Sequence, residues 1–402
     1  MRAAAFAQGA LWELSRWKLG SQSLLDHVAV VSSVSGGSFT AAHFACFGAD
    51  GFDRFEAKFL SRNIPFSGLL PFSFRGDNIW KLVTRRWGPL LADYLHQELF
   101  SECRFGDLRS YPRLVINATD LVLGRQFSFT SRYFEPIGRD LSSERLADAV
   151  AASAAFPVLL SPITLRNVGW NNRKEPQWVT NAEGDVHRNL TRFRAAQAWR
   201  TYANAKSYPY VHLADGGLSD NSGAYSIAES FADADVPPTL LDMISQCPPR
   251  HLAVFGINAK TRPLMSSAKR PQPPHAVKVL LTAATSSMDL RTDDSIQQVE
   301  VVLQNYAGQK NLADKWDPVE GVSPPDGGYV PIVTKDWSAY VGHVSFDSEQ
   351  DAIAQHRLFA VGTNLSLDRF TVRHVHNAGA RLLGEHPSFR RFVKDINGTR
   401  QP

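Results

Sequence analysis

The chain has 402 residues, of which 44% are hydrophobic and 20% charged, and 43 Lys and Arg against 39 Asp and Glu leave a net charge of +4. This composition is typical of a folded globular protein and excludes a disordered chain, a collagen-like fibre and a coiled coil. So small a positive excess, without a basic run, gives no indication of a nucleic-acid partner. No apolar run of about 18 residues predicts a membrane span.

The three cysteines, Cys46, Cys103 and Cys247, are far apart and odd in number. They form no CxxC pair and no zinc-binding spacing, so the sequence predicts neither a disulfide framework nor a structural metal. We expect Cys46, which lies in an apolar stretch, to be a buried packing residue. The first residues lack the pattern of a signal peptide, which leaves the cellular compartment open.

Hydrophobic periodicity predicts the first elements. Residues 2–17 have the pattern of an amphipathic helix, and residues 27–33 are apolar and β-branched, as in a buried parallel strand. A Ser- and Gly-rich turn then leads into a helical pattern over residues 39–47. The predicted order is therefore strand, tight turn, helix.

Strands and helices alternate along the rest of the chain. We predict strands at 113–117, 126–130, 208–214 and 251–258, and helices at 142–155 and 349–383. This alternation predicts an α/β fold with a layered sheet.

No internal repeat or low-complexity linker divides the sequence, so we predict a single domain over residues 1–402. Its core would span about 2–260, with a surface insertion that carries one helix at 166–207 and a C-terminal extension from about 261 to 402. Residues 305–340 contain several Gly and Pro and are predicted to form a long excursion.

The turn Ser33-Val34-Ser35-Gly36-Gly37 has the pattern of a nucleophile elbow. Such an elbow places a serine on a strained strand-to-helix turn, with small residues two positions before and after it because they approach each other closely. Ser35 satisfies this rule, with Ser33 before it and Gly37 after it. The helix that follows presents free N–H groups to a developing oxyanion. An ordinary helix-capping turn is the alternative interpretation.

A serine nucleophile needs a base. None of the twelve histidines lies in a strand-end loop with catalytic neighbours, and His343, after Gly342 in an irregular stretch, is the least easily dismissed. Asp215 ends a predicted strand and precedes Gly216-Gly217, which would let a ligand or backbone approach closely. Burial would raise its basicity, whereas the alternative is a turn-capping Asp. A second copy, Asp326-Gly327-Gly328, follows two prolines and is interpreted as a plain turn.

At these residues the chain resembles the patatin-like phospholipase family, whose members use a Ser–Asp dyad without histidine. The similarity covers Arg2 to about residue 260 and, more loosely, residues 363–367. Four segments carry it in the same order as in the family: Ser33-Val-Ser-Gly-Gly-Ser38, Asn117-Ala-Thr-Asp120, Ala152-Ser-Ala-Ala-Phe-Pro157 and Asp215-Gly-Gly-Leu-Ser-Asp-Asn221.

The resemblance implies a three-layer α/β fold with a mainly parallel central sheet flanked by helices. It implies that Ser35 is the nucleophile and Asp215 the general base, supported by Ser33, Gly37, Gly216 and Gly217. The substrate would be a lipid or another fatty-acyl ester, with no metal or organic cofactor. The segments at 117–120 and 152–157 are interpreted as architecture rather than catalysis.

The chain departs from the family at its beginning. Family members carry a glycine-rich loop, close to GGGxR, whose N–H groups form the oxyanion hole. Arg2 matches that arginine and residues 3–9 match the helix after it. We therefore expect that the sequence starts at an internal methionine or is otherwise shortened. In this form, the Gly36 N–H would be the remaining oxyanion donor, and weak activity and low stability are expected.

Residues 64–93 interleave aromatic and basic side chains, including Phe72, Phe74, Trp80 and Arg85. This composition suits peripheral contact with a membrane or a lid over an acyl pocket. A helical cap packed on the core is the other interpretation.

Two alternatives to a lipid hydrolase stay open. The chain could be a catalytically impaired or non-catalytic family member that binds lipid or protein. It could also be a thioesterase or transacylase that uses the same dyad.

Overall fold

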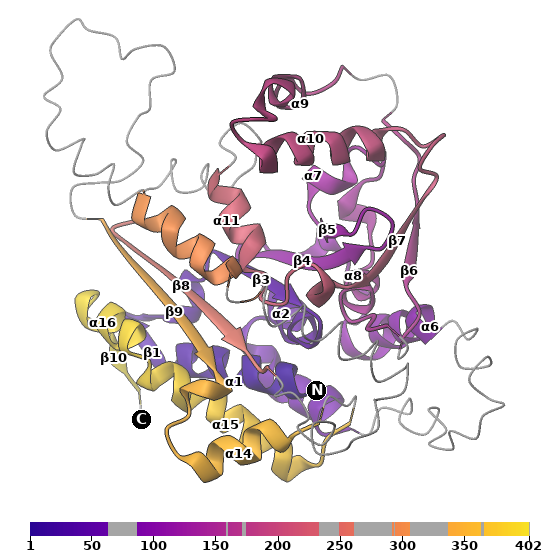
Figure 1. Ribbon diagram of the computed structural model, residues 1–402. Helices are drawn as coiled ribbons and strands as arrows, with labels where there is room; N and C mark the ends of the chain where they lie inside the picture. Colours follow the sequence, from indigo (N-terminus) through magenta and orange to yellow (C-terminus); the bar gives the residue numbers. More distant parts are fainter. Residues whose placement is uncertain are drawn as a thin grey trace, which may run out of the picture.

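A five-stranded mixed sheet runs through the part of the protein that carries the predicted motifs (Figure 1). The computed structural model describes residues 1–62, 87–157, 160–170, 174–232, 249–260, 292, 294–305, 337–362 and 366–401. None of the helices in these ranges combines the length and the apolar character needed to traverse a bilayer.

The sheet follows the order β3-β4-β7-β6, and β5 also pairs with β4. The strands are β3 (Val30–Val34), β4 (Arg113–Asp120), β5 (Arg125–Ser128), β6 (Ile163–Arg166) and β7 (Tyr210–Asp215). Four of the predicted strands are therefore present here with shifted ends, and β6 was not predicted.

The expectation of a mainly parallel sheet is not confirmed, although the fold is α/β. Only β3 and β4 are parallel in this sheet, whereas β4–β5, β4–β7 and β6–β7 are antiparallel. The physical reason is visible for β4 and β5, which are joined by a tight turn at Gly124 with φ +61°. A parallel pair would need a crossover of about a dozen residues or more.

Helices pack on the sheet and on one another. The predicted helix at 142–155 is shorter, because α8 (Leu146–Ser153) begins only after a 3-10 turn. Helix α8 contacts β4 and β7, and its side chains are almost entirely buried. The other helices of this region are α1 (Arg2–Arg16), α2 (Gly36–Phe47), α3 (Phe52–Phe55), α6 (Trp87–Tyr94), α7 (Ser131–Phe134) and α11 (Ala224–Ala232), with π-helical turns at 56–60 and 95–99.

The predicted insertion at 166–207 contains two helices rather than one. These are α9 (Gln177–Asn181) and α10 (Leu190–Ala203), which place Trp178 and Trp199 in a small apolar cluster of their own. The sequence indicated only one of them, because α9 is a single short turn of five residues, whereas α10 is longer and also reaches the main core through Tyr202.

The C-terminal part forms a second layer around α1. Strands β8 (His251–Asn258) and β9 (Ser338–Ser345) form a separate parallel pair, and residues 294–305 are helical. The predicted helix at 349–383 is divided into α14 (Ala352–Ala360) and α15 (Arg369–Glu385), followed by α16 (Pro387–Asp395). Strand β10 (Thr399–Arg400) joins β1 (Trp17–Leu19) and β2 (Gln22–Ser23) in a small antiparallel sheet.

Cys46 and Cys103 form a disulfide, with their Cα atoms 6.9 Å apart. The prediction of no disulfide framework is therefore wrong for this pair. The two residues are separated by 57 positions, and only the fold brings the end of α2 to the turn after residue 99. Such a pairing has no local sequence signature.

Several predictions fall outside the described residues. These include Phe72, Phe74, Trp80 and Arg85, the Asp326-Gly327-Gly328 turn, Cys247, residues 363–365 and most of the excursion at 305–340. Of the region 64–93, residues from Trp87 onward are described, and Trp87 is 5% exposed. Trp87 packs in the main hydrophobic core, as the cap interpretation expects for this residue.

Candidate active site

Ser35 occupies the sharp turn between β3 and α2. It has φ 51° and ψ −127°, a conformation that is uncommon for a residue with a side chain. Ser35 is partly exposed, whereas Ser33 before it is buried. A strained, accessible serine at the start of a helix is the geometry that the elbow pattern predicted.

The glycine that the elbow requires most is Gly36. A Cβ atom on Gly36 would lie 3.0 Å from the Cβ of Ala3 in α1, which is tighter than most real contacts. A Cβ on Gly37 would meet no atom within 4 Å among the described residues. The expected close approach at Gly37 is therefore not found, and the steric demand falls on its neighbour.

Asp215 meets Ser35 because β3 and β7 are both registered on β4. Val34 pairs with Asn117, and Asp215 pairs with the next residue, Ala118. The two strands run in opposite directions, so their C-terminal ends converge on neighbouring positions of β4. The Ser35 Oγ donates a hydrogen bond of 2.7 Å to Asp215 Oδ2. The predicted proximity is present, but through an antiparallel rather than a parallel pairing.

The surroundings of Asp215 make its carboxyl group an unusually strong base for an aspartate. The residue is 1% exposed, and this burial raises its pKa from 3.8 to about 6, against the opposing effect of the Ser35 hydroxyl and the Gly217 N–H. The Gly217 N–H donates to Oδ1 at 2.8 Å. The carboxylate is thus ionised at neutral pH, with both oxygens held in place.

Gly216 is required by the backbone of β4. A Cβ atom at this position would lie 2.2 Å from the carbonyl oxygen of Asn117, a distance at which no side chain fits. The Asp-Gly-Gly segment therefore combines a base, a position without space for a side chain and, at Gly217, a hydrogen-bond donor.

Ser153, at the end of α8, contacts Ser35 and was not predicted as a site residue. Its Oγ accepts the main-chain N–H of Ser35 at 2.9 Å and donates to the Asn117 carbonyl at 2.6 Å. It also lies 2.9 Å from the Ser38 Oγ. The available signal was a polar residue in an otherwise apolar, fully buried helix, within the segment interpreted as architecture.

These contacts leave the Gly36 N–H as the next main-chain donor beside Ser35. Because the Ser35 N–H is engaged by Ser153, the next N–H of the turn belongs to Gly36, in the first turn of α2. First-turn N–H groups have no acceptor within their own helix, and no hydrogen bond of the Gly36 N–H is found among the described residues. Gly36 can therefore donate to a ligand oxygen beside Ser35.

Asn117 and Asp120 have architectural roles, as expected for their segment. The Asn117 amide donates to Ser32 Oγ at 2.9 Å and to the Ser33 carbonyl at 3.1 Å, which braces the strand that leads into the elbow. Asp120 is fully buried and accepts hydrogen bonds from the Tyr202 and Tyr208 hydroxyls.

No described histidine is hydrogen-bonded to Ser35 or Asp215. The His43 ring in α2 packs at a tilt against the rings of Phe47 and Phe55, and burial lowers its pKa to about 3, so it is a neutral packing residue. His343 lies on β9 rather than in the irregular stretch expected for it. Among the described residues, no group of three or more His, Cys, Asp or Glu side chains is placed so that it could bind a metal ion.

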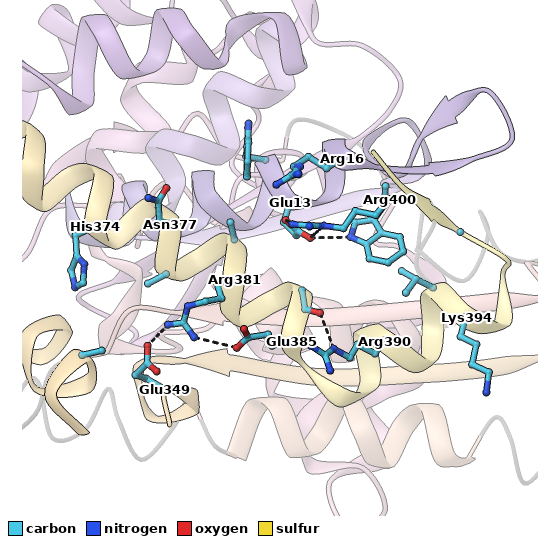
Figure 2. Close-up of a pocket in the computed structure, with 18 residues that line it drawn as sticks. Glu13, Arg16, Glu349, His374, Asn377, Arg381, Glu385, Arg390, Lys394 and Arg400 are labelled. Carbon is cyan, nitrogen blue, oxygen red and sulfur yellow. Dashed lines mark hydrogen bonds and ion pairs between the residues drawn. The ribbon is translucent and has the colours of Figure 1, made fainter. Parts of the chain in front are cut away.

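A cavity of about 920 Å³ lies along α1, α15 and α16 (Figure 2), and neither Ser35 nor Asp215 lines it. Its carboxylates are paired: Glu13 with Arg400, and Glu349 and Glu385 with Arg381. This cavity is therefore separate from the candidate active site.

A family model described as patatin-like phospholipase matches residues 1–227, a range that contains every predicted site residue. No curated protein matches the chain.

Proposed function

Because the chain belongs to the patatin-like phospholipase family, we propose that it is a serine acyl hydrolase that cleaves fatty-acyl esters of lipids. Lipid acyl hydrolysis is the activity of the family; the dyad and the ester specificity are our proposal for this chain. The observation that carries the proposal is the 2.7 Å hydrogen bond from the strained Ser35 to the buried Asp215.

In the first half of the reaction, Asp215 accepts the Ser35 hydroxyl proton while Oγ attacks the ester carbonyl carbon. The carbonyl oxygen becomes an oxyanion, which the Gly36 N–H and the positive end of the α2 dipole stabilise. The tetrahedral intermediate then breaks its bond to the alcohol oxygen, which takes the proton from Asp215. The products are an alcohol and an acyl-Ser35 ester.

In the second half, water replaces the alcohol. Asp215 accepts a proton from the water, whose oxygen attacks the acyl carbonyl carbon. The Gly36 N–H again stabilises the oxyanion that forms. Collapse breaks the bond to Ser35 Oγ, which recovers its proton from Asp215 and releases the fatty acid. A carboxyl group with a pKa of about 6 suits both directions of proton transfer near neutral pH.

Fluorophosphonate labelling of the purified chain, with the modified residue mapped by mass spectrometry, tests this proposal. We expect label on Ser35 and its loss in Ser35→Ala and in Asp215→Asn. The matched control is Asp220→Asn, from the same segment: Asp220 accepts N–H groups of Ser222 and Tyr225 at the start of α11 and does not contact Ser35. Label elsewhere, or equal labelling of Asp215→Asn, would overturn the assignment.

A further inference from the structure

Helix α1 lies directly beside the nucleophile elbow. Ala3 in its first turn is the nearest neighbour of the position that a Gly36 Cβ would occupy, at 3.0 Å. The Thr40 hydroxyl of α2 donates to the Ala4 carbonyl at 2.8 Å. Any displacement of the first turn of α1 therefore acts on the turn that presents the Gly36 N–H.

On another face, α1 packs against α15 with direct contact between the two backbones. A Cβ on Gly379 would lie 2.1 Å from the carbonyl oxygen of Phe6, and one on Gly9 would lie 1.9 Å from the carbonyl oxygen of His376. In most packed helix pairs, side chains separate the two backbones, but at Gly9 and Gly379 there is no side chain between them. The separation of the two helix axes is consequently fixed by main-chain atoms.

The first turn of α1 is also anchored to the chain between β9 and α15. The Arg2 Nη1 donates to the Val361 carbonyl at 2.7 Å. The rings of Phe6 and Phe346 pack edge to face with centroids 4.9 Å apart, and the Arg2 guanidinium lies 5.9 Å from the Phe346 ring centre. These contacts hold the end of α1 that touches Gly36.

The opposite end of α1 is held by the same part of the chain. Arg400 donates to both carboxylate oxygens of the buried Glu13, at 2.8 and 2.9 Å (Figure 2). Trp17 packs edge to face on Phe389. The described residues of the segment 337–401 thus contact α1 from its first turn to its last.

We propose that residues 337–362 and 366–401, which lie beyond the range matched by the family model, position the active site through α1, with Gly379 as the positioning residue. The inference rests on the proposed function, because it acts on the Gly36 donor of that site. It assigns a role in the reaction to a segment that contributes no group to the chemistry.

A methyl group at position 379 would test whether the active site depends on the spacing of α1 and α15. Carbon atoms do not approach within 3.0 Å of such neighbours, and the Cβ would start at 2.1 Å from the Phe6 carbonyl. The helices must separate by roughly 1 Å, a misplacement that can cost about 100-fold when it reaches catalytic groups. We expect Gly379→Ala to lower the rate of Ser35 labelling by about 10- to 100-fold.

Two other variants separate this effect from general damage. Gly184→Ala adds the same methyl group at a position where no atom of the described residues lies within 4 Å, so its rate should equal that of the wild type. Phe346→Leu removes the ring that contacts Phe6 and should slow labelling while keeping an apolar side chain. All rates are measured at a temperature where circular dichroism shows each variant to be folded.

A soluble ester assay gives a readout that lost stability alone would not produce, provided that kcat is expressed per Ser35 labelled at the end point of fluorophosphonate titration, because unfolded molecules are then not counted. In Gly379→Ala, kcat should fall while KM and the pH midpoint remain those of the wild type, because the surroundings of Asp215 are unchanged. Labelling of folded Gly379→Ala and Phe346→Leu at the wild-type rate would overturn the inference alone. Absence of label in the wild type would overturn the proposed function and this inference with it.

Discussion

Ser153 holds the main-chain N–H of Ser35 from a helix that lies 118 positions further along the chain. The bond orients the peptide unit that leads into the elbow, and it takes this N–H away from the substrate. Ser153 touches only the backbone of Ser35, and in the proposed mechanism it thereby determines which N–H group faces the ester.

We predict that Ser153→Ala lowers the free energy of unfolding by about 1–3 kcal/mol, because the partly buried Ser35 N–H loses its acceptor and the buried Asn117 carbonyl loses a donor. Labelling of Ser35 should also slow by about 10-fold. The control is Ser38→Ala, which removes the Ser38–Ser153 contact and leaves the bond to Ser35 intact. Equal effects of the two variants in denaturant titrations and labelling rates would contradict this role.

The pH dependence of labelling follows from the raised pKa of Asp215. The carboxylate must be ionised to accept the Ser35 proton, so the rate should fall as the pH drops through about 6. An unperturbed aspartate, near 3.8, would keep full activity down to pH 5. Labelling rates measured from pH 4.5 to 8 distinguish the two, and a midpoint near 4 would show that burial does not control this base.

The same burial predicts that Asp215 destabilises the fold at neutral pH. Its pKa is higher in the folded than in the unfolded chain, so the folded state binds the proton more tightly. The resulting stabilisation is present below about pH 4 and is lost as the pH rises through about 6. At pH 8 the burial of Asp215 therefore lowers the free energy of unfolding by about 3 kcal/mol relative to its value below about pH 4.

Asp215→Asn, which stays neutral, should therefore be more stable than the wild type at pH 8 and similar to it at pH 4. Urea titrations at the two pH values check this expectation. A variant that loses stability equally at both would show that the hydrogen bonds of the carboxylate outweigh its desolvation.

The two glycine-rich turns should respond differently to added methyl groups. Gly216→Ala places a Cβ against the Asn117 carbonyl, and we expect a loss of at least 2 kcal/mol in unfolding free energy and of detectable labelling. Gly37→Ala has space among the described residues, and Ala is favoured over Gly in a helix, so its free energy of unfolding should be unchanged or higher by up to about 1 kcal/mol. Thermal melts of the pair provide the comparison, and the reverse order would refute the steric argument.

The Cys46–Cys103 disulfide should contribute to stability. We predict that Cys103→Ser lowers the unfolding free energy by roughly 2–4 kcal/mol. A reducing agent should lower the Tm of the wild type to that of the variant and leave the variant unchanged. Intact-mass analysis before and after reduction reports whether the bond is present, and a variant with the wild-type Tm would show that it contributes little.

The elements nearest the site were the most predictable from sequence. The elbow at Ser35 and the strand before Asp215 were predictable because their constraints are local: a strained turn needs small neighbours, and a carboxylate at a strand end needs flexible residues after it. The buried helix that ends at Ser153 was also found, since its apolar character persists over two turns.

What escaped prediction depends on contacts between distant segments. The direction of β7 relative to β4 leaves no mark in either strand's composition, so the mixed sheet was not foreseen. Ser153 looked like one small residue among alanines, and its role exists only because Asn117 and Ser35 lie against it. The disulfide and the close contact of Gly379 with Phe6 likewise join residues that no local sequence pattern links.

The meeting of Val34 and Asp215 on adjacent positions of β4 has a consequence for how this protein can vary. Ser35 and Asp215 are 180 positions apart, yet their spacing is measured on one strand and does not depend on the length of chain between them. Residues 177–193, which form α9 and the first turn of α10 in the connection from β6 to β7, can lengthen, shorten or exchange their surface without changing the distance from hydroxyl to carboxylate. Tyr202, later in the same connection, is held to β4 by Asp120. Loss or gain of one residue within β4 would separate Ser35 from Asp215 at once.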